Sequence, residues 1–188
     1  MVRRFAPTSV PEAVLTRVLE SVLHAPSAGF AQGTELIVLD RPHDLSEFWH
    51  ITDPRGRKRP PEEGGPPVIV IPFSNQAAYL RRYSEPDKQG LGLDQAAAWP
   101  VPYWDLDTAM AAMLMLLTAV DQGLGAWFFG IFAGEDELLR WLEVPRGCRP
   151  IGALALGYPS PLDRVRGSVR SRPRRRLEEI IHRGRWPG

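Results

Sequence analysis

The chain has little of several features that would assign it to a specialised class of protein. It has a single cysteine, Cys148, so no internal disulfide can form. Its four histidines show none of the spacings that zinc sites use, and we predict no metal site. The longest unbroken apolar run, residues 109–117, is far shorter than the roughly 20 residues needed to cross a bilayer. The N-terminus also lacks the apolar stretch of a secretory signal, so we expect a cytoplasmic protein with no membrane partner.

What is present fits an ordinary globular domain with an unusual tail. Apolar residues make up 44% and charged residues 24% of the 188 residues, which fits one domain over residues 1–188. The net charge is +1, but residues 161–188 hold nine arginines against three acidic residues, a net charge of +6, which leaves −5 elsewhere. This tail has too few apolar residues for a core of its own. We expect residues 160–188 to bind anions and to extend along the domain or onto a partner chain.

Apolar periodicity predicts alternating helices and strands. Residues 14–23 carry apolar side chains at helical spacing, and Ser9 to Glu12 before them has the form of a capping box. Short apolar runs predict buried strands at 35–40, 67–72 and 152–158. Residues 106–120 are apolar nearly all round, which is typical of a helix buried on most sides, with Asp105 as its cap. With an extended segment at 127–132 and a short helix at 135–142, this order favours a layered α+β domain around a mixed sheet.

Two segments are candidates for ligand binding. Residues 25–33 contain small residues that let a backbone approach a ligand closely, although a loop that needs Pro and Gly only to turn would look the same. Residues 74–104 are unusually aromatic for a loop and are interpreted as a lid. Within it, Trp99, Tyr103 and Trp104 either line a substrate pocket or cover the core.

Six blocks of sequence, taken in order, resemble the nitroreductase family of flavoproteins. The blocks are Arg3 to Phe5, residues 25–32, 103–106, 123–130, 150–159 and 174–182. The resemblance implies a three-layer α/β/α fold with a central mixed sheet. It also implies a homodimer with exchanged C-terminal extensions and two FMN sites at the interface, each built from residues of both chains.

The resemblance also implies which residues bind the cofactor. Residues 26–29 would lie against the flavin and its ribityl chain, with Gln32 helping to hold the turn. Gly130 and Ile131 would offer backbone groups near the isoalloxazine edge, and two arginines of the tail would reach the phosphate as guanidinium forks. The full set carried over is Arg3, Pro26, Ser27, Ala28, Gly29, Gln32, Gly130, Ile131, Arg174 and Arg176.

The sequence also departs from the family pattern. Met1 falls where the family's Arg-Arg-Ser triplet ends, so two phosphate-binding arginines have no counterpart. Phe30 stands where many members have Asn, and Gly33-Thr34 replaces a common Pro-Trp pair.

The function that the resemblance implies is an FMN-dependent oxidoreductase. It would take electrons from NADH or NADPH and pass them to a small aromatic, nitro- or quinone-type acceptor in a ping-pong cycle. Because the flavin carries the chemistry, no catalytic side chain is expected. Dehalogenation, flavin fragmentation, use of a deazaflavin and flavin binding without turnover remain alternatives on the same fold. A nucleic-acid-binding function for the arginine tail is a distant alternative because the tail lacks interleaved aromatics, and we predict no such partner.

Overall fold

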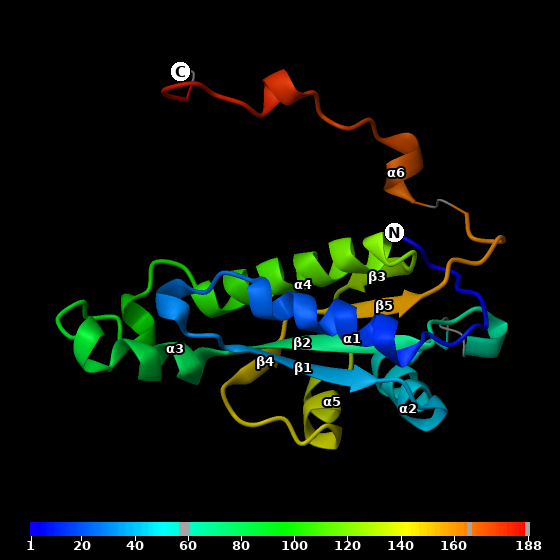
Figure 1. Ribbon diagram of the computed structural model, residues 1–188, viewed down its shortest axis with the longest axis horizontal. Coiled ribbons are helices and arrows are strands. Elements are labelled where there is room, and N and C mark those ends of the chain that lie inside the picture. Colours follow the sequence, from blue (N-terminus) through cyan, green and yellow to red (C-terminus); the bar gives the residue numbers. More distant parts are fainter. Residues whose placement is uncertain (57–60, 165–166, 187–188) are drawn as a thin grey trace.

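The computed structural model describes residues 1–56, 61–164 and 167–186, arranged as Figure 1 shows. The strands are β1 (Thr34–Leu39), β2 (Val68–Asn75), β3 (Gly125–Phe129), β4 (Cys148–Pro150) and β5 (Ala153–Gly157). The α-helices are α1 (Glu12–Glu20), α2 (Pro42–Thr52), α3 (Gln76–Tyr83), α4 (Tyr103–Asp121), α5 (Glu135–Trp141) and the single turn α6 (Ser168–Ser171). Short 3₁₀ turns are η1 (Ser21–His24), η2 (Ala28–Phe30), η3 (Pro61–Glu63), η4 (Pro86–Lys88), η5 (Ala96–Ala98) and η6 (Leu177–Glu179).

The sheet has the order β1-β2-β5-β3, and β4 pairs with the end of β2. The expected α+β class is confirmed. All strand pairs found in the described ranges are antiparallel, however, where we expected a mixture of directions. An alternation of helices and strands along the sequence does not fix strand direction, because direction depends on the end of the sheet to which each connection returns.

Two cores lie on opposite faces of the sheet, and β2 belongs to both. Val68 and Val70 pack with α1 and α4, whereas Ile69, Ile71 and Phe73 pack with α2 and α5. Successive side chains of a strand point to opposite faces, so a strand covered on both sides is apolar throughout. Figure 1 shows α1 and α4 on one side of the sheet and α2 and α5 on the other. The expected three layers are therefore present.

The starts of α1 and α4 differ from the predictions. Pro11 is the N-cap of α1 and no side chain caps the helix, so the predicted capping box is wrong. Ser9 lies two residues before the N-cap, whereas a capping side chain must come from the N-cap itself. Asp105 lies within the first turn of α4, behind the N-cap Pro102. Its side chain turns instead to Ser74 and Arg149.

Helix α4 is covered on one face and bare on the other. Its Met115 and Ala119 are fully buried in the core that packs against the sheet. The opposite face carries apolar residues with exposed fractions of 41–66%, namely Leu106, Met110, Met113, Leu117 and Val120. The expectation of a helix buried on most sides is therefore wrong for a single chain. By length and composition alone α4 would qualify as a membrane span, with 39% of that window buried in the fold.

The C-terminal tail stands clear of the body in Figure 1. Nearly all its described side chains are exposed, which agrees with the expectation that it forms no core. Its root is fixed to the N-terminal segment, where the carboxylate of Asp163 accepts the backbone N–H groups of Arg3 and Arg4 at 3.2 and 3.0 Å. The N–H of Ser160 donates to the carbonyl of Arg4 at 3.0 Å.

Candidate cofactor site

The turn at residues 27–32 has a strained backbone. Gly29, Phe30 and Gln32 have φ values of 60°, 57° and 50°, in the left-handed region. Glycine adopts this conformation freely, but each of the other two residues costs on the order of 1–2 kcal/mol there. Such a conformation persists only where surrounding contacts hold it. The shape of this turn is therefore imposed by its neighbours.

Hydrogen bonds from α4 and from within the turn hold it. The carboxylate of Asp107 on α4 is buried and accepts the N–H of Ala28 at 2.8 Å and the hydroxyl of Tyr79 at 2.7 Å. Burial and the hydrogen bond to Asp107 raise the pKa of Tyr79 well above its ordinary value, so this hydroxyl stays a donor. The backbone N–H of Gln32 donates to Oγ of Ser27 at 3.0 Å. It is thus the main chain of Gln32 that closes the turn, while its side chain is exposed.

The opposite side of the turn is open. Pro26 is exposed, Ser27 and Ala28 are half-buried, and 72% of Phe30 is accessible. Gly29 lies against the ring of Tyr83, so closely that a Cβ placed on it would be 2.8 Å from the ring. Gly29 thus allows the turn to pack against Tyr83, while the small side chains of Ser27 and Ala28 leave the main chain accessible to a flat ligand from solvent.

Gly130 and Ile131 line a cavity of about 450 Å³ at the end of β3, whose inner wall is aromatic. Trp49 stacks on Phe129 with ring centroids 5.5 Å apart, and Trp127 packs on Phe129 at 4.5 Å. These rings give the cavity an apolar wall suited to an aromatic ligand.

Arg3 stands beside this cavity. Its guanidinium carbon lies 5.7 Å from the centre of the Trp127 ring, within the range of a cation–π contact. Arg174 and Arg176 lie in the exposed tail, and Arg176 pairs with Glu179 at 3.2 Å. Neither arginine is among the residues that line the cavity within one chain, and the tail as a whole stands clear of the body (Figure 1). The turn at residues 27–32 does not line this cavity either, because it packs against α3 and α4.

The three aromatic residues predicted to line a substrate pocket lie together in one cluster. Trp99 contacts the rings of Tyr103 and Trp104 at 5.7 and 5.8 Å and donates its indole N–H to the carbonyl of Leu93 at 2.8 Å. Trp104 is buried against Tyr79, which gives it a packing role. Tyr103 is 39% exposed and presents the open edge of the cluster.

A polar cluster lies at the start of α4. Asp105 accepts hydrogen bonds from Oγ of Ser74 at 2.7 Å and from Nε of Arg149 at 3.0 Å, and this pairing raises the pKa of the Arg149 guanidinium. In the described part of the chain, no group of three or more His, Cys, Asp or Glu side chains is placed to hold a metal.

The sequence analysis did not identify the residues that support the turn and form the aromatic wall of the cavity. They are Trp49, Tyr79, Arg82, Asp107 and Trp127. Asp107 left a signal, because a carboxylate inside an apolar helix must find hydrogen-bond donors when it is buried. Tyr79 and Trp127 lie in segments that the sequence analysis singled out, residues 74–104 and 123–130, but neither was given a role. Trp49 and Arg82 left no signal, since Phe129 and Gly29, which they contact, are distant in the sequence.

Comparison with known proteins identifies the family of this chain. The model of the nitroreductase family matches residues 1–158. An NADPH-dependent oxidoreductase of Staphylococcus saprophyticus is 24% identical over 98% of this chain and 70% of its own length.

Two solved structures share the fold. A nitroreductase family protein from Clostridium difficile superposes with a TM-score of 0.69 at 20% identity, covering 98% of this chain and 93% of its own. A nitroreductase from B. subtilis gives 0.75 at 19% identity, covering 99% and 71%. The family match spans both the turn and the cavity, and the chain therefore belongs to the nitroreductase family.

Proposed function

We propose that this protein is an FMN-dependent oxidoreductase that uses NADH or NADPH to reduce small aromatic, nitro- or quinone-type acceptors. The observation that carries the proposal is the family match over residues 1–158, which contain both the open turn and the aromatic cavity. The name of the staphylococcal relative agrees with a nicotinamide donor. A cytoplasmic location remains part of this prediction.

The residues present fit an FMN group. The small residues at 26–29 suit close contact with the flavin and ribityl chain, and Gly130 and Ile131 offer main-chain groups beside an aromatic wall. A phosphate dianion needs fixed cations, for which Arg174 and Arg176 remain exposed. Arg3, at the edge of the cavity, is a third cation of the proposed site.

When bound, FMN would supply the redox chemistry, accepting electrons from the nicotinamide and delivering them to the acceptor in ping-pong order. The chain's own residues would bind and orient the reactants and limit access of water. Tyr103, as the exposed edge of its cluster, is the strongest candidate among the three predicted pocket residues to meet an acceptor. No side chain is assigned a catalytic proton transfer.

We further propose that the protein is a homodimer joined through α4. Exposed apolar residues recur there at intervals of four and three, which places them on one face of the helix. A continuous apolar stripe of this kind marks an interface rather than a solvated surface. The tail also exposes apolar residues among its arginines, namely Leu177, Ile180, Ile181 and Trp186. Each tail would then reach across its partner and carry Arg174 and Arg176 to the partner's cavity.

An anaerobic titration tests the proposed function. Purified protein is mixed with FMN, unbound flavin is removed, and the visible absorbance is followed as NADH or NADPH is added. Bound flavin that bleaches with one donor and recovers on adding a quinone would support the proposal. Bound flavin that neither donor reduces would favour a flavin-binding protein without turnover. Failure of the dimeric protein to retain FMN would refute the assignment.

A further inference from the structure

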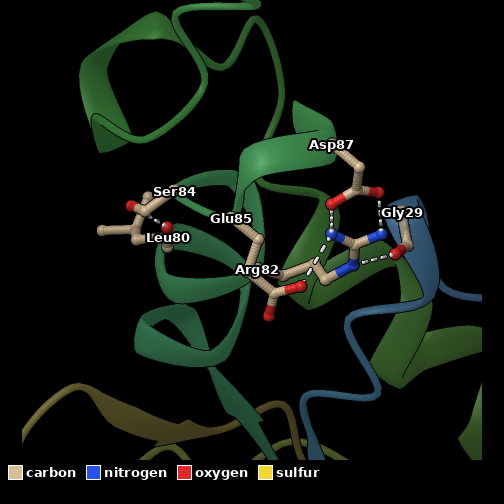
Figure 2. Close-up of polar contacts among 6 residues, drawn as sticks. All are labelled: Gly29, Leu80, Arg82, Ser84, Glu85 and Asp87. Atoms are coloured by element: carbon tan, nitrogen blue, oxygen red, sulfur yellow. Dashed lines mark hydrogen bonds and ion pairs between the residues drawn. The ribbon is translucent and has the colours of Figure 1, made fainter. Parts of the chain in front are cut away.

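Figure 2 shows a second anchor on the turn, on the side of α3. Arg82 has a side chain that is only 22% exposed, and its Nε donates to the carbonyl of Gly29 at 2.8 Å. Its two Nη groups donate to the two carboxylate oxygens of Asp87, each at 2.7 Å. Nη1 also donates to Glu85 at 3.0 Å. The guanidinium plane is thereby fixed, with Nε aimed at the turn.

This anchor and Asp107 hold two consecutive residues of the turn from different helices. The carboxylate on α4 takes the N–H of Ala28, and the guanidinium on α3 takes the C=O of Gly29. Both are charge-assisted hydrogen bonds, which are shorter and stronger than neutral ones. They flank the start of the segment in which Gly29, Phe30 and Gln32 adopt left-handed conformations. Both helices are therefore needed to hold the strained backbone, since each one fixes only one of the two residues.

We propose that Arg82 and Asp107 are positioning residues that pre-set the turn at residues 27–32 in the shape it presents to the flavin. The identity of the ligand as a flavin rests on the proposed function, whereas the anchoring of the turn rests on the hydrogen bonds alone. Neither side chain needs to touch the cofactor. They order the turn before the ligand binds, so that binding does not incur the entropic cost of ordering it.

The first test is made on flavin-free protein. Amide hydrogen exchange is measured in the peptide containing residues 27–32 for the wild type, Arg82→Lys and Asp107→Asn. Lysine keeps the positive charge but loses the planar fork, so it cannot serve Asp87 and Gly29 together. Arg81→Lys is the matched control, because Arg81 is the exposed neighbour on the same helix. We expect exchange in the turn to be about tenfold faster in both test variants and unchanged in the control.

The second test measures FMN dissociation constants and the visible spectrum of bound flavin in the same proteins. We expect about tenfold weaker binding and an altered spectrum in Arg82→Lys, with global stability monitored by urea unfolding. A merely structural role would lower stability and leave the spectrum of bound flavin unchanged. If Asp107→Asn does not fold, Arg82→Lys and Asp87→Asn carry the test, since both positions are near the surface.

The outcomes separate this inference from the proposed function. Unchanged exchange in the turn of Arg82→Lys would overturn the anchoring role, whether or not FMN binds. Faster exchange with unchanged FMN affinity and spectrum would overturn the link between the turn and the flavin. A wild-type protein that binds no FMN would refute the proposed function, while the exchange data would still decide whether the two residues position the turn.

Discussion

At the scale of single residues, Gly29 is under two separate constraints. Its φ of 60° disfavours any side chain, and its Cα faces the ring of Tyr83. We expect Gly29→Ala to lower the free energy of unfolding by about 1 kcal/mol for the backbone conformation and by a further 1 kcal/mol or so for displacing the ring. Urea unfolding at a fixed protein concentration would measure the loss.

Gly92 provides the matched control. Its φ is 68°, and a Cβ placed on it would meet nothing within 4 Å. Gly92→Ala should therefore lose only the backbone contribution, about 1 kcal/mol. Equal losses in the two variants would mean that Tyr83 does not restrict the turn.

The raised pKa of Tyr79 leads us to expect that the free energy of unfolding depends on pH. Its pKa is raised in the folded protein above the ordinary value of 10.0, first by burial and then by Asp107. Below about pH 10 the hydroxyl is protonated in both states, so its contribution is fully present. Above that pH the unfolded chain releases the proton and the folded chain does not, and stability falls. We expect the unfolding free energy of wild type relative to Tyr79→Phe to be constant up to about pH 9 and to decline towards pH 11. A flat difference up to about pH 11 would contradict this account.

The residues proposed to contact the flavin and the residues that support the turn left different signals in the sequence. Residues 26–29 and Gly130 could be named because their motifs are continuous in the sequence. Asp107 and Arg82 could not be placed, because each acts on a backbone group more than 50 positions away. Long-range partners of this kind become visible only when the fold brings the elements together.

At the scale of secondary structure elements, the exposed face of α4 makes the sharpest prediction. Placing a carboxylate in an apolar interface is costly because the charge must be desolvated without a partner. We expect Leu117→Glu to convert a dimer into a monomer in size-exclusion chromatography with light scattering. Ala13→Glu, at an exposed position of α1, adds the same charge elsewhere and should leave the mass unchanged. A dimeric Leu117→Glu protein would show that subunits associate through another surface.

Element prediction succeeded where the apolar pattern had one interpretation. The strands near β1, β2 and β5 and the helix α5 were found, but α2, α3 and β4 were missed. Helix α3 lies within residues 74–104, which were interpreted as an aromatic loop acting as a lid. Helix α2 had a signal, since Leu45, Phe48 and Ile51 recur at intervals of three and are buried together. Strand β4 is too short to show any period. For α4 the pattern correctly indicated apolar surface all round, but it could not say whether a second chain covers part of it.

At the scale of the whole molecule, the tail is separable from the body except at its root. Truncation after Arg164 would keep the contacts of Asp163 with Arg3 and Arg4 and remove the described arginines from 170 onward. We expect the truncated body to keep its circular dichroism spectrum and to lose most of its FMN affinity. The variant Arg174→Ala/Arg176→Ala in the full chain should weaken FMN binding without changing the fold. If the truncated protein binds FMN as tightly as the full chain, the tail makes no contact with the phosphate.

A tail that stands clear of its own body has a genetic consequence. If each tail serves the partner's cavity, a chain with damaged tail arginines and a chain with a damaged cavity are complementary. In a mixed dimer the intact tail of one chain meets the intact cavity of the other and forms one complete site. The second site combines the damaged tail with the damaged cavity. Random mixing would make half of the dimers mixed, and a quarter of all sites would regain flavin. Two inactive alleles expressed together would then restore a measurable activity that neither has alone.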